Sequence, residues 1–177
     1  ADCGPAVISM SQDVQGEAYD YPEIFFEERI HEIRRIHPDP NQIKKAADKL
    51  KNSKQPIIIS GGGVLYSEAE EEISAFATKH NIPVTATVMG IGCMNKDDPY
   101  YISAIGCLGE GSSNNLATDT DLALAVGTKL GDFTTGSWTN FENENFQLVS
   151  INTSRFDTTK HRATPVVSDA KIGLQEL

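Results

Sequence analysis

The chain has 177 residues, and its 25 Asp and Glu outnumber its 15 Lys and Arg, so the formal net charge is −10. Nucleic acid and anionic membranes both need a basic patch, so this charge argues against either as a partner. The hydrophobic fraction of 39% is ordinary for a globular protein, and no apolar run reaches the roughly 18 residues of a membrane span.

Cysteine usage and the N-terminal sequence predict the cellular location. The three cysteines, Cys3, Cys93 and Cys107, are an odd number and lie far apart, which argues against a disulfide framework. No basic segment leading into an apolar one opens the chain, so we expect no signal peptide. A reducing, cytoplasmic location is the prediction.

The first 40 residues differ in character from the rest. Residues 5–10 are an apolar run that predicts a short buried strand. Residues 11–40 contain prolines and a run of mixed charge, which predict a linker that lies on a surface. The sequence therefore divides into residues 1–40 and a domain of residues 41–177.

Regular alternation of helices and strands begins after Pro40. Asp39 is predicted to cap a helix that ends near residues 52–53, because apolar residues follow at helical spacing. Residues 56–60 form an apolar run typical of a strand buried on both faces. Ser67 and Glu70 have the spacing of a capping box at the start of the next helix.

The same alternation continues to the C-terminus. Further strands are predicted at residues 82–88, 102–105, 121–126, 146–151 and 165–167, with a helix at 112–119 and the start of another at the end of the chain. Strands that alternate with helices imply crossover connections and a parallel sheet. We therefore predict an α/β fold with a doubly wound, mainly parallel, six-stranded Rossmann-like sheet.

Motifs for catalysis and metal binding are missing from the sequence. There is no nucleophile elbow, and the glycine-rich stretch after residue 60 lacks the ending of a Walker loop. The four histidines show no metal-ligand spacing. We predict no catalytic residue and no metal ligand in this chain.

Glycines at strand ends are the features most suggestive of a ligand. Three consecutive glycines start at Gly61, where the first strand of the domain ends, and glycines there let the backbone approach a phosphate. Against this, Tyr66 replaces the third glycine of the dinucleotide fingerprint, and four glutamates between residues 68 and 72 surround the expected helix start. The alternative is a structural turn that needs positive φ.

A second cluster, residues 126–136, follows another buried strand and would lie on the same edge of the sheet. It is either one wall of a cleft or an ordinary loop with Asx and Ser/Thr turns, and residues 109–115 are either a helix cap or a ligand loop. The candidate nucleotide cleft comprises Gly61, Gly62, Gly63, Gly127, Thr128, Asp132 and Asn152.

Several stretches together resemble the central domain of thiamine-diphosphate enzymes, a superfamily that includes acetohydroxyacid synthase and pyruvate oxidase. These stretches are residues 56–63, 82–84, 106–117, 121–128, 151–152 and 169–170. Within the superfamily, residues 12–22, 127–137, 160–163 and 169–171 are most similar to the trihydroxycyclohexane-1,2-dione hydrolases of inositol catabolism.

The resemblance implies a longer, three-domain enzyme. Its first domain would supply the Glu that activates thiamine diphosphate, and its third the Gly-Asp-Gly segment that holds Mg²⁺. Neither is recognised here, since Phe133 follows Gly131 and Asp132 where the last glycine should stand. Residues 1–40 would be the tail of the pyrimidine-binding domain plus a linker, and residues 41–177 the central domain.

The activity implied for the longer enzyme is hydrolysis of a carbon–carbon bond in a cyclic 1,2-dione. Its other two domains would be the partners of this chain, and the whole enzyme a homo-oligomer. The chain alone would be structural and inactive.

Related central domains bind FAD, but Asn152 and Ser154 stand where those relatives carry acids. FAD is therefore not expected, and NAD or another adenine nucleotide is the expected occupant of any cleft. The alternative is an acetohydroxyacid-synthase-like central domain that binds FAD or another nucleotide.

Overall fold

The computed structural model describes residues 5–30 and 32–177. Internal contacts divide the chain into two units, Ala1–Arg34 and Arg35–Leu177. Among the described residues, no helix has both the length and the apolar character needed to cross a membrane.

The first unit has little regular structure. It contains two short helices, α1 (Gln12–Gln15) and η1 (Glu23–Phe25), and its described side chains are exposed. Tyr21 packs between Tyr19 and Phe25, with ring centroids 5.1 and 4.9 Å away. The described residues are largely irregular, as predicted. Their role as a linker and their assignment to a preceding domain stay predictions.

The strand predicted at residues 5–10 is wrong. These residues are exposed and belong to no strand. A strand needs a partner for its backbone hydrogen bonds, and the strands of the sheet lie between residues 56 and 167, all paired with one another.

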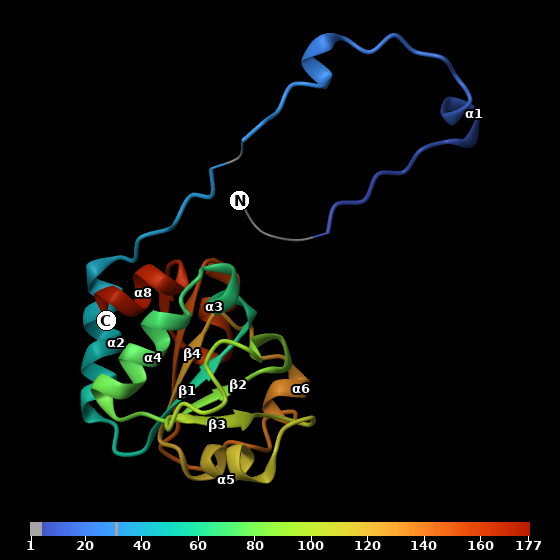
Figure 1. Ribbon diagram of the computed structural model, residues 1–177. Coiled ribbons are helices and arrows are strands. Elements are labelled where there is room, and N and C mark those ends of the chain that lie inside the picture. The colour runs from blue at the N-terminus through green and yellow to red at the C-terminus, as the bar shows by residue number, and fades with distance from the viewer. Residues whose placement is uncertain (1–4, 31) are drawn as a thin grey trace. The chain divides into compact units, whose positions relative to one another are not determined.

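The second unit contains one six-stranded sheet in the order β3-β2-β1-β4-β5-β6 (Figure 1). Its strands are β1 (Pro56–Ser60), β2 (Val84–Ala86), β3 (Tyr101–Ala104), β4 (Leu122–Val126), β5 (Gln147–Asn152) and β6 (Thr164–Val167). Every neighbouring pair is parallel, which confirms the predicted doubly wound Rossmann-like sheet. Strand β2 is shorter than predicted because Pro83 has no N–H to donate and a helical turn begins at Val88.

Helices precede, connect and follow these strands. They are α2 (Pro40–Asn52), α3 (Gly62–Tyr66), α4 (Glu70–His80), η2 (Val88–Gly90), α5 (Gly111–Asp119), α6 (Asp132–Thr135), α7 (Arg155–Thr159), η3 (Lys160–Arg162) and α8 (Ala170–Glu176). The predicted cap of α2 is confirmed, since the Asp39 carboxylate accepts the N–H of Asn41 with Pro40 at the first helical position.

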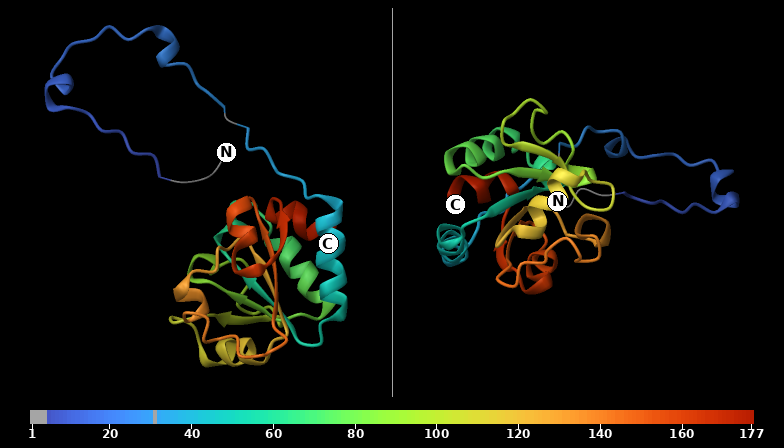
Figure 2. Two further views of the ribbon diagram at one scale, coloured as in Figure 1. Left: turned by 180° about the vertical axis from the view of Figure 1, so that it is seen from behind. Right: turned by 90° about the horizontal axis from the view of Figure 1, so that it is seen from below.

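Side chains of β1 alternate between two cores. Ile58 belongs to the core under α2, α4 and α8, together with Ala46, Ile73 and Leu174. Ile57 and Ile59 belong to the core on the opposite side, beneath α5. Both Figure 1 and the view from behind in Figure 2 show α2, α4 and α8 side by side, with α5 apart from them. Burial on both faces explains why β1 and β4 are apolar at nearly every position.

The capping box predicted at Ser67 and Glu70 is wrong. Helix α4 begins at Glu70 with Ala69 as N-cap and no side-chain cap. The Ser67 hydroxyl instead donates to the Asp169 carboxylate at 2.9 Å, beside the N-terminus of α8. The Ser67 hydroxyl, which the local spacing predicted to cap α4, therefore forms a tertiary hydrogen bond instead.

Candidate functional site

The candidate site lies where the strand order reverses. Strands β1 and β4 are neighbours at the centre of the sheet, and the chain proceeds from them toward opposite edges. Ligands in such folds bind at the carboxyl ends of the strands at this position. Gly61 follows β1 and Gly127 follows β4, so the predicted glycines do lie at the reversal point.

Backbone hydrogen bonds join the ends of β1, β4 and β5. The N–H of Gly61 donates to the carbonyl of Val126 at 2.8 Å, and the N–H of Gly63 to that of Gly127 at 2.9 Å. The N–H of Gly127 donates in turn to the carbonyl of Ile151 at 2.9 Å. These donors, which could face a phosphate in a dinucleotide site, are bonded to the protein's own backbone.

Glycine is required here by close packing. A Cβ on Gly63 would lie 2.6 Å from the Cα of Gly127, and one on Gly61 would lie 2.4 Å from the Gly127 carbonyl oxygen. The expected positive φ in this turn is wrong, because Gly61 has φ −112° and the left-handed residue is Gly127, with φ 62°. Gly62 is less confined, since a Cβ added there would lie 3.1 Å from the Met89 carbonyl oxygen.

Asn152 bridges β5 to the end of β4. Its amide nitrogen donates to the carbonyl of Thr128 at 3.3 Å, and its amide oxygen accepts the N–H of Ser154 at 2.9 Å. The Thr128 hydroxyl accepts the N–H of Leu130 at 3.3 Å. The Thr128 bond is a Ser/Thr turn of the kind that the sequence offered for residues 126–136 as the alternative to a cleft wall, and the Asn152 bond to Ser154 is an Asx turn in the next connection.

Asp132 is placed differently from the other candidates. It is exposed at the start of the four-residue helix α6. This helix packs against the turn after β3, where the N–H of Cys107 donates to the carbonyl of Phe133 at 2.8 Å. The helix that carries Asp132 is therefore hydrogen-bonded to the connection after β3. The glycines, Thr128 and Asn152 are instead hydrogen-bonded to one another's segments where the strand order reverses.

The glutamates also lie elsewhere than the sequence suggested. Helix α3 begins within the glycine run, at Gly62, and has no acidic residue in its first turn, whereas Glu70, Glu71 and Glu72 begin α4. The expectation that they crowd the helix after the glycine turn is therefore wrong. Residues 109–115 contain the start of α5, with Glu110 as the N-cap, which agrees with the helix cap that the sequence offered as one alternative, although no side chain caps this helix.

A charged group that the sequence did not single out lies beyond β5. Burial opposes ionisation of Asp157, yet its pKa lies below the usual range because Lys160 and Ser154 hydrogen-bond to it and Lys129 adds positive charge. The Lys160 ammonium is 2.6 Å from the Asp157 carboxylate. This pair offsets the charge of Lys160 in the connection after β5.

A shallow pocket of about 560 Å³ has none of the candidate cleft residues in its lining. It is lined by the start of α4 and the segment after η2, including Glu70, Ser74, Cys93 and Asp98. The Ser74 hydroxyl donates to Asp98 at 2.7 Å. Burial raises the pKa of the Cys93 thiol, which argues against a reactive thiolate. Among the described residues, no group of three His, Cys, Asp or Glu is placed to hold a metal ion.

Two solved enzyme structures share this architecture. The chain matches benzoylformate decarboxylase from Polynucleobacter necessarius with a TM-score of 0.62 and 26% identity, over 85% of this chain and 30% of that one. It matches a putative thiamin diphosphate-dependent enzyme from Mycobacterium smegmatis with a TM-score of 0.63 and 19% identity, over 82% and 28% of the two chains. The second match supports the fold alone.

Curated relatives match along the whole chain. A protein of Clostridium perfringens named 3D-(3,5/4)-trihydroxycyclohexane-1,2-dione hydrolase is 42% identical over 177 residues, and one of Bacillus cereus with the same enzyme name is 41% identical. The chain spans 28% of the length of each of these relatives.

The family described as "Thiamine pyrophosphate enzyme, central domain" matches residues 43–177, which include all six strands. The chain therefore belongs to the thiamine pyrophosphate enzyme family and carries its central domain.

Proposed function

We propose that this chain is the central, structural part of a longer thiamine-diphosphate-dependent hydrolase that cleaves a carbon–carbon bond in a cyclic 1,2-dione during inositol degradation. The observation that carries the proposal is identity of 41–42% along the whole chain with proteins named trihydroxycyclohexane-1,2-dione hydrolase. For the longer enzyme we also propose a cytoplasmic location and assembly into a homo-oligomer, with its other two domains as partners of this chain.

Thiamine diphosphate and Mg²⁺ belong, in this proposal, to the other domains. The cofactor supplies a carbon that stabilises the carbanion left by bond cleavage. The described residues of this chain do not fit it: Asp132 is exposed on a four-residue helix, and no acidic cluster is placed to hold the metal. We therefore assign no catalytic step to this chain.

The structural role is supported by the strand ends. The N–H groups of Gly61, Gly63 and Gly127 and the amide of Asn152 all bond to the protein's own backbone. Groups engaged in this way hold β1, β4 and β5 in register.

A second candidate function is nucleotide binding at the same place. It is favoured by the position of the glycines at the reversal of strand order, where an adenine nucleotide such as NAD could lie against bare backbone. FAD is disfavoured, because Asn152 replaces an acidic residue and is engaged with Thr128.

The test is ring opening of the dione by the full-length polypeptide. We expect turnover with thiamine diphosphate and Mg²⁺, loss of turnover on chelation, and recovery when Mg²⁺ is restored. The 177-residue chain under the same conditions is the matched control and should match a buffer blank. An inactive but folded full-length protein that binds thiamine diphosphate would contradict the proposed reaction.

A further inference from the structure

The segment that leads into α2 is held at the start of α8. Arg35 Nη1 donates to the Asp169 carboxylate at 3.0 Å and to the carbonyl of Ser67 at 2.6 Å. The carbonyl of Ile36 accepts the N–H of Asp169 at 2.9 Å. Residues 35–39, here named the strap, are therefore fixed to the N-terminus of α8 just before α2 begins.

The two carboxylate oxygens of Asp169 have different partners. Oδ1 accepts the N–H groups of Lys171 and Ile172 at 3.0 and 3.3 Å, and so caps α8. Oδ2 accepts Arg35 at 3.0 Å and the Ser67 hydroxyl at 2.9 Å. Because the cap uses one oxygen and the strap the other, the contact with Arg35 can break while α8 stays capped.

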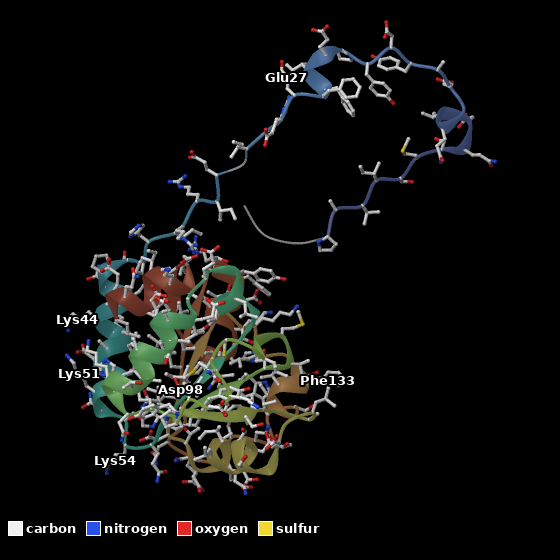
Figure 3. All side chains as sticks on the ribbon, in the orientation of Figure 1. Glu27, Lys44, Lys51, Lys54, Asp98 and Phe133 are labelled. Carbon is white, nitrogen blue, oxygen red and sulfur yellow. The ribbon has the colours of Figure 1, made fainter. Side chains whose placement is uncertain are left out.

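Polar contacts hold the strap, whereas apolar packing holds the helix that follows it. Ile36, the large apolar side chain of the strap, is 40% exposed. In α2, Ala46 is fully buried in the core, and Figure 3 shows Lys44 and Lys51 on the outer side of the helix. A segment with few buried apolar contacts opens at a lower free energy than a packed core. The strap is therefore the weaker of the two attachments.

The ion pair of the strap is partly open to solvent. The Arg35 side chain is 30% exposed and the Asp169 side chain 9%. Dissolved salt screens a charge pair to the extent that water reaches it. The attachment of the strap should therefore weaken as the ionic strength rises, whereas the apolar packing of α2 should not.

We propose that the strap is a releasable, salt-sensitive attachment: it leaves the start of α8 while the sheet and the helices stay folded. The closed strap fixes the chain at Arg35, and the open strap leaves it fixed at Asp39, the N-cap of α2. Moving the fixed point from Arg35 to Asp39 adds about 14 Å of free chain, at roughly 3.4 Å per residue. The strap thus sets how much free chain precedes α2.

Backbone hydrogen exchange tests the release in the 177-residue chain. The Asp169 N–H is bonded to the Ile36 carbonyl, so its exchange measures opening of the strap. The N–H of Gly173 measures opening of α8, and that of Ile58 measures opening of the sheet. After correction for intrinsic rates, we expect Asp169 to exchange about tenfold faster or more than Gly173 and Ile58, because the strap opens locally.

Salt and two variants test what holds the strap. Raising NaCl from about 0.05 M to about 0.5 M should accelerate exchange at Asp169 about threefold and leave Gly173 and Ile58 unchanged. Arg35→Ala should accelerate exchange at Asp169 about tenfold or more, with Ile58 still protected as evidence of folding. Glu68→Gln is the matched control, because Glu68 is the other ion-pair partner of Arg35, at 3.4 Å and 81% exposed. It should leave exchange at Asp169 unchanged.

Limited digestion with trypsin measures the release independently in the wild-type chain. Arg29 is exposed and lies outside the strap, whereas cleavage after Arg35 needs the strap to open and enter the protease. We expect cleavage after Arg35 to be about tenfold slower or more than cleavage after Arg29 at low salt. The difference should narrow at high salt.

Four results would overturn the inference. Exchange of Asp169 at the rate of Ile58 would show that the strap opens only when the whole unit unfolds. Exchange of Gly173 as fast as that of Asp169 would show that α8 opens with the strap. Rates at Asp169 that do not respond to salt would exclude the ion pair as the attachment. Equal cleavage after Arg29 and Arg35 at low salt would show that the strap is not held closed.

Discussion

Arg35 and Asp169 are 134 residues apart in the chain, yet the Arg35 Nη1 lies 3.0 Å from the Asp169 Oδ2. The same nitrogen donates to the carbonyl of Ser67 at 2.6 Å, and Asp169 also accepts the N–H of Lys171 at the start of α8 at 3.0 Å. Asp169 is 9% exposed at its side chain, so this pair is better shielded than a surface ion pair. The pair fixes the first residue of the second unit against α8.

Arg35→Ala should therefore destabilise the second unit by about 1–3 kcal/mol, because it leaves a shielded carboxylate without its cationic partner. The midpoint of urea unfolding measures the change. Lys44→Ala is the matched control, since Lys44 pairs with Asp48 on the exposed face of α2, and its midpoint should equal that of the wild type. Equal midpoints for both variants would show that the Arg35 pair contributes nothing.

Gly63→Ala should destabilise the fold by about 1–3 kcal/mol, because the new Cβ would overlap the backbone of Gly127. Gly62→Ala is the control at the neighbouring position. There a gain in helix propensity of about 1 kcal/mol offsets the tight contact with Met89. Thermal unfolding of both variants without added ligand measures the difference. Equal melting temperatures for the two variants would contradict the claim that close packing against Gly127 requires glycine at position 63.

The sequence predicted the fold well because the relevant signals are local. The apolar run of β1 and the Asp39 cap before Pro40 are properties of adjacent residues, and the structure bears out both. Ser67 shows the limit: its spacing to Glu70 predicted a cap, but its hydroxyl bonds to Asp169, and sequence spacing carries no information about that contact.

The sequence predicts where the candidate site lies, at the carboxyl ends of β1 and β4, better than it predicts which residues meet there. Gly61 and Gly127 meet as expected for glycines at the ends of parallel strands. Asp132 lies in the same predicted loop as Gly127 and Thr128, yet it begins α6, which packs against the β3 connection. The reason for glycine at Gly63 depends on how closely two backbones approach, and residue types alone do not give that distance.

Ile58→Ala should cost about 2–5 kcal/mol of stability, because Ile58 is fully buried in the core beneath α4 and the smaller side chain leaves a cavity. Ile91→Ala is the comparison, since Ile91 is 56% exposed and loses little on truncation. Denaturant midpoints measure both. A midpoint for Ile58→Ala as high as that for Ile91→Ala would contradict the buried central position of β1.

Asp121 should make stability depend on pH. Burial acts to raise its pKa, but hydrogen bonds from the Ser53 hydroxyl and from the N–H groups of Lys54 and Gln55 outweigh burial and lower the pKa. A lowered pKa in the folded state means that Asp121 stabilises the fold at pH values above the unfolded pKa of about 3.9. This contribution is lost as the pH falls through the folded value.

Asp121→Asn should therefore be less stable than the wild type at pH 7, with a difference that narrows as the pH is lowered below about 4. Urea midpoints at a series of pH values measure the difference. Asp13→Asn, in the exposed α1, is the control and should follow the wild type throughout. A difference between Asp121→Asn and wild type that stays constant down to acid pH would contradict the hydrogen-bonded carboxylate.

The most direct test of a structural role for this domain is isothermal titration of the 177-residue chain with FAD and, separately, with NAD. Because the N–H groups of Gly61, Gly63 and Gly127 are bonded to the protein itself and Asn152 is engaged with Thr128, we expect FAD to bind weakly or not at all. A dissociation constant for FAD near or below about 1 μM, equivalent to about −8 kcal/mol, would contradict this role and make the strand ends a flavin site.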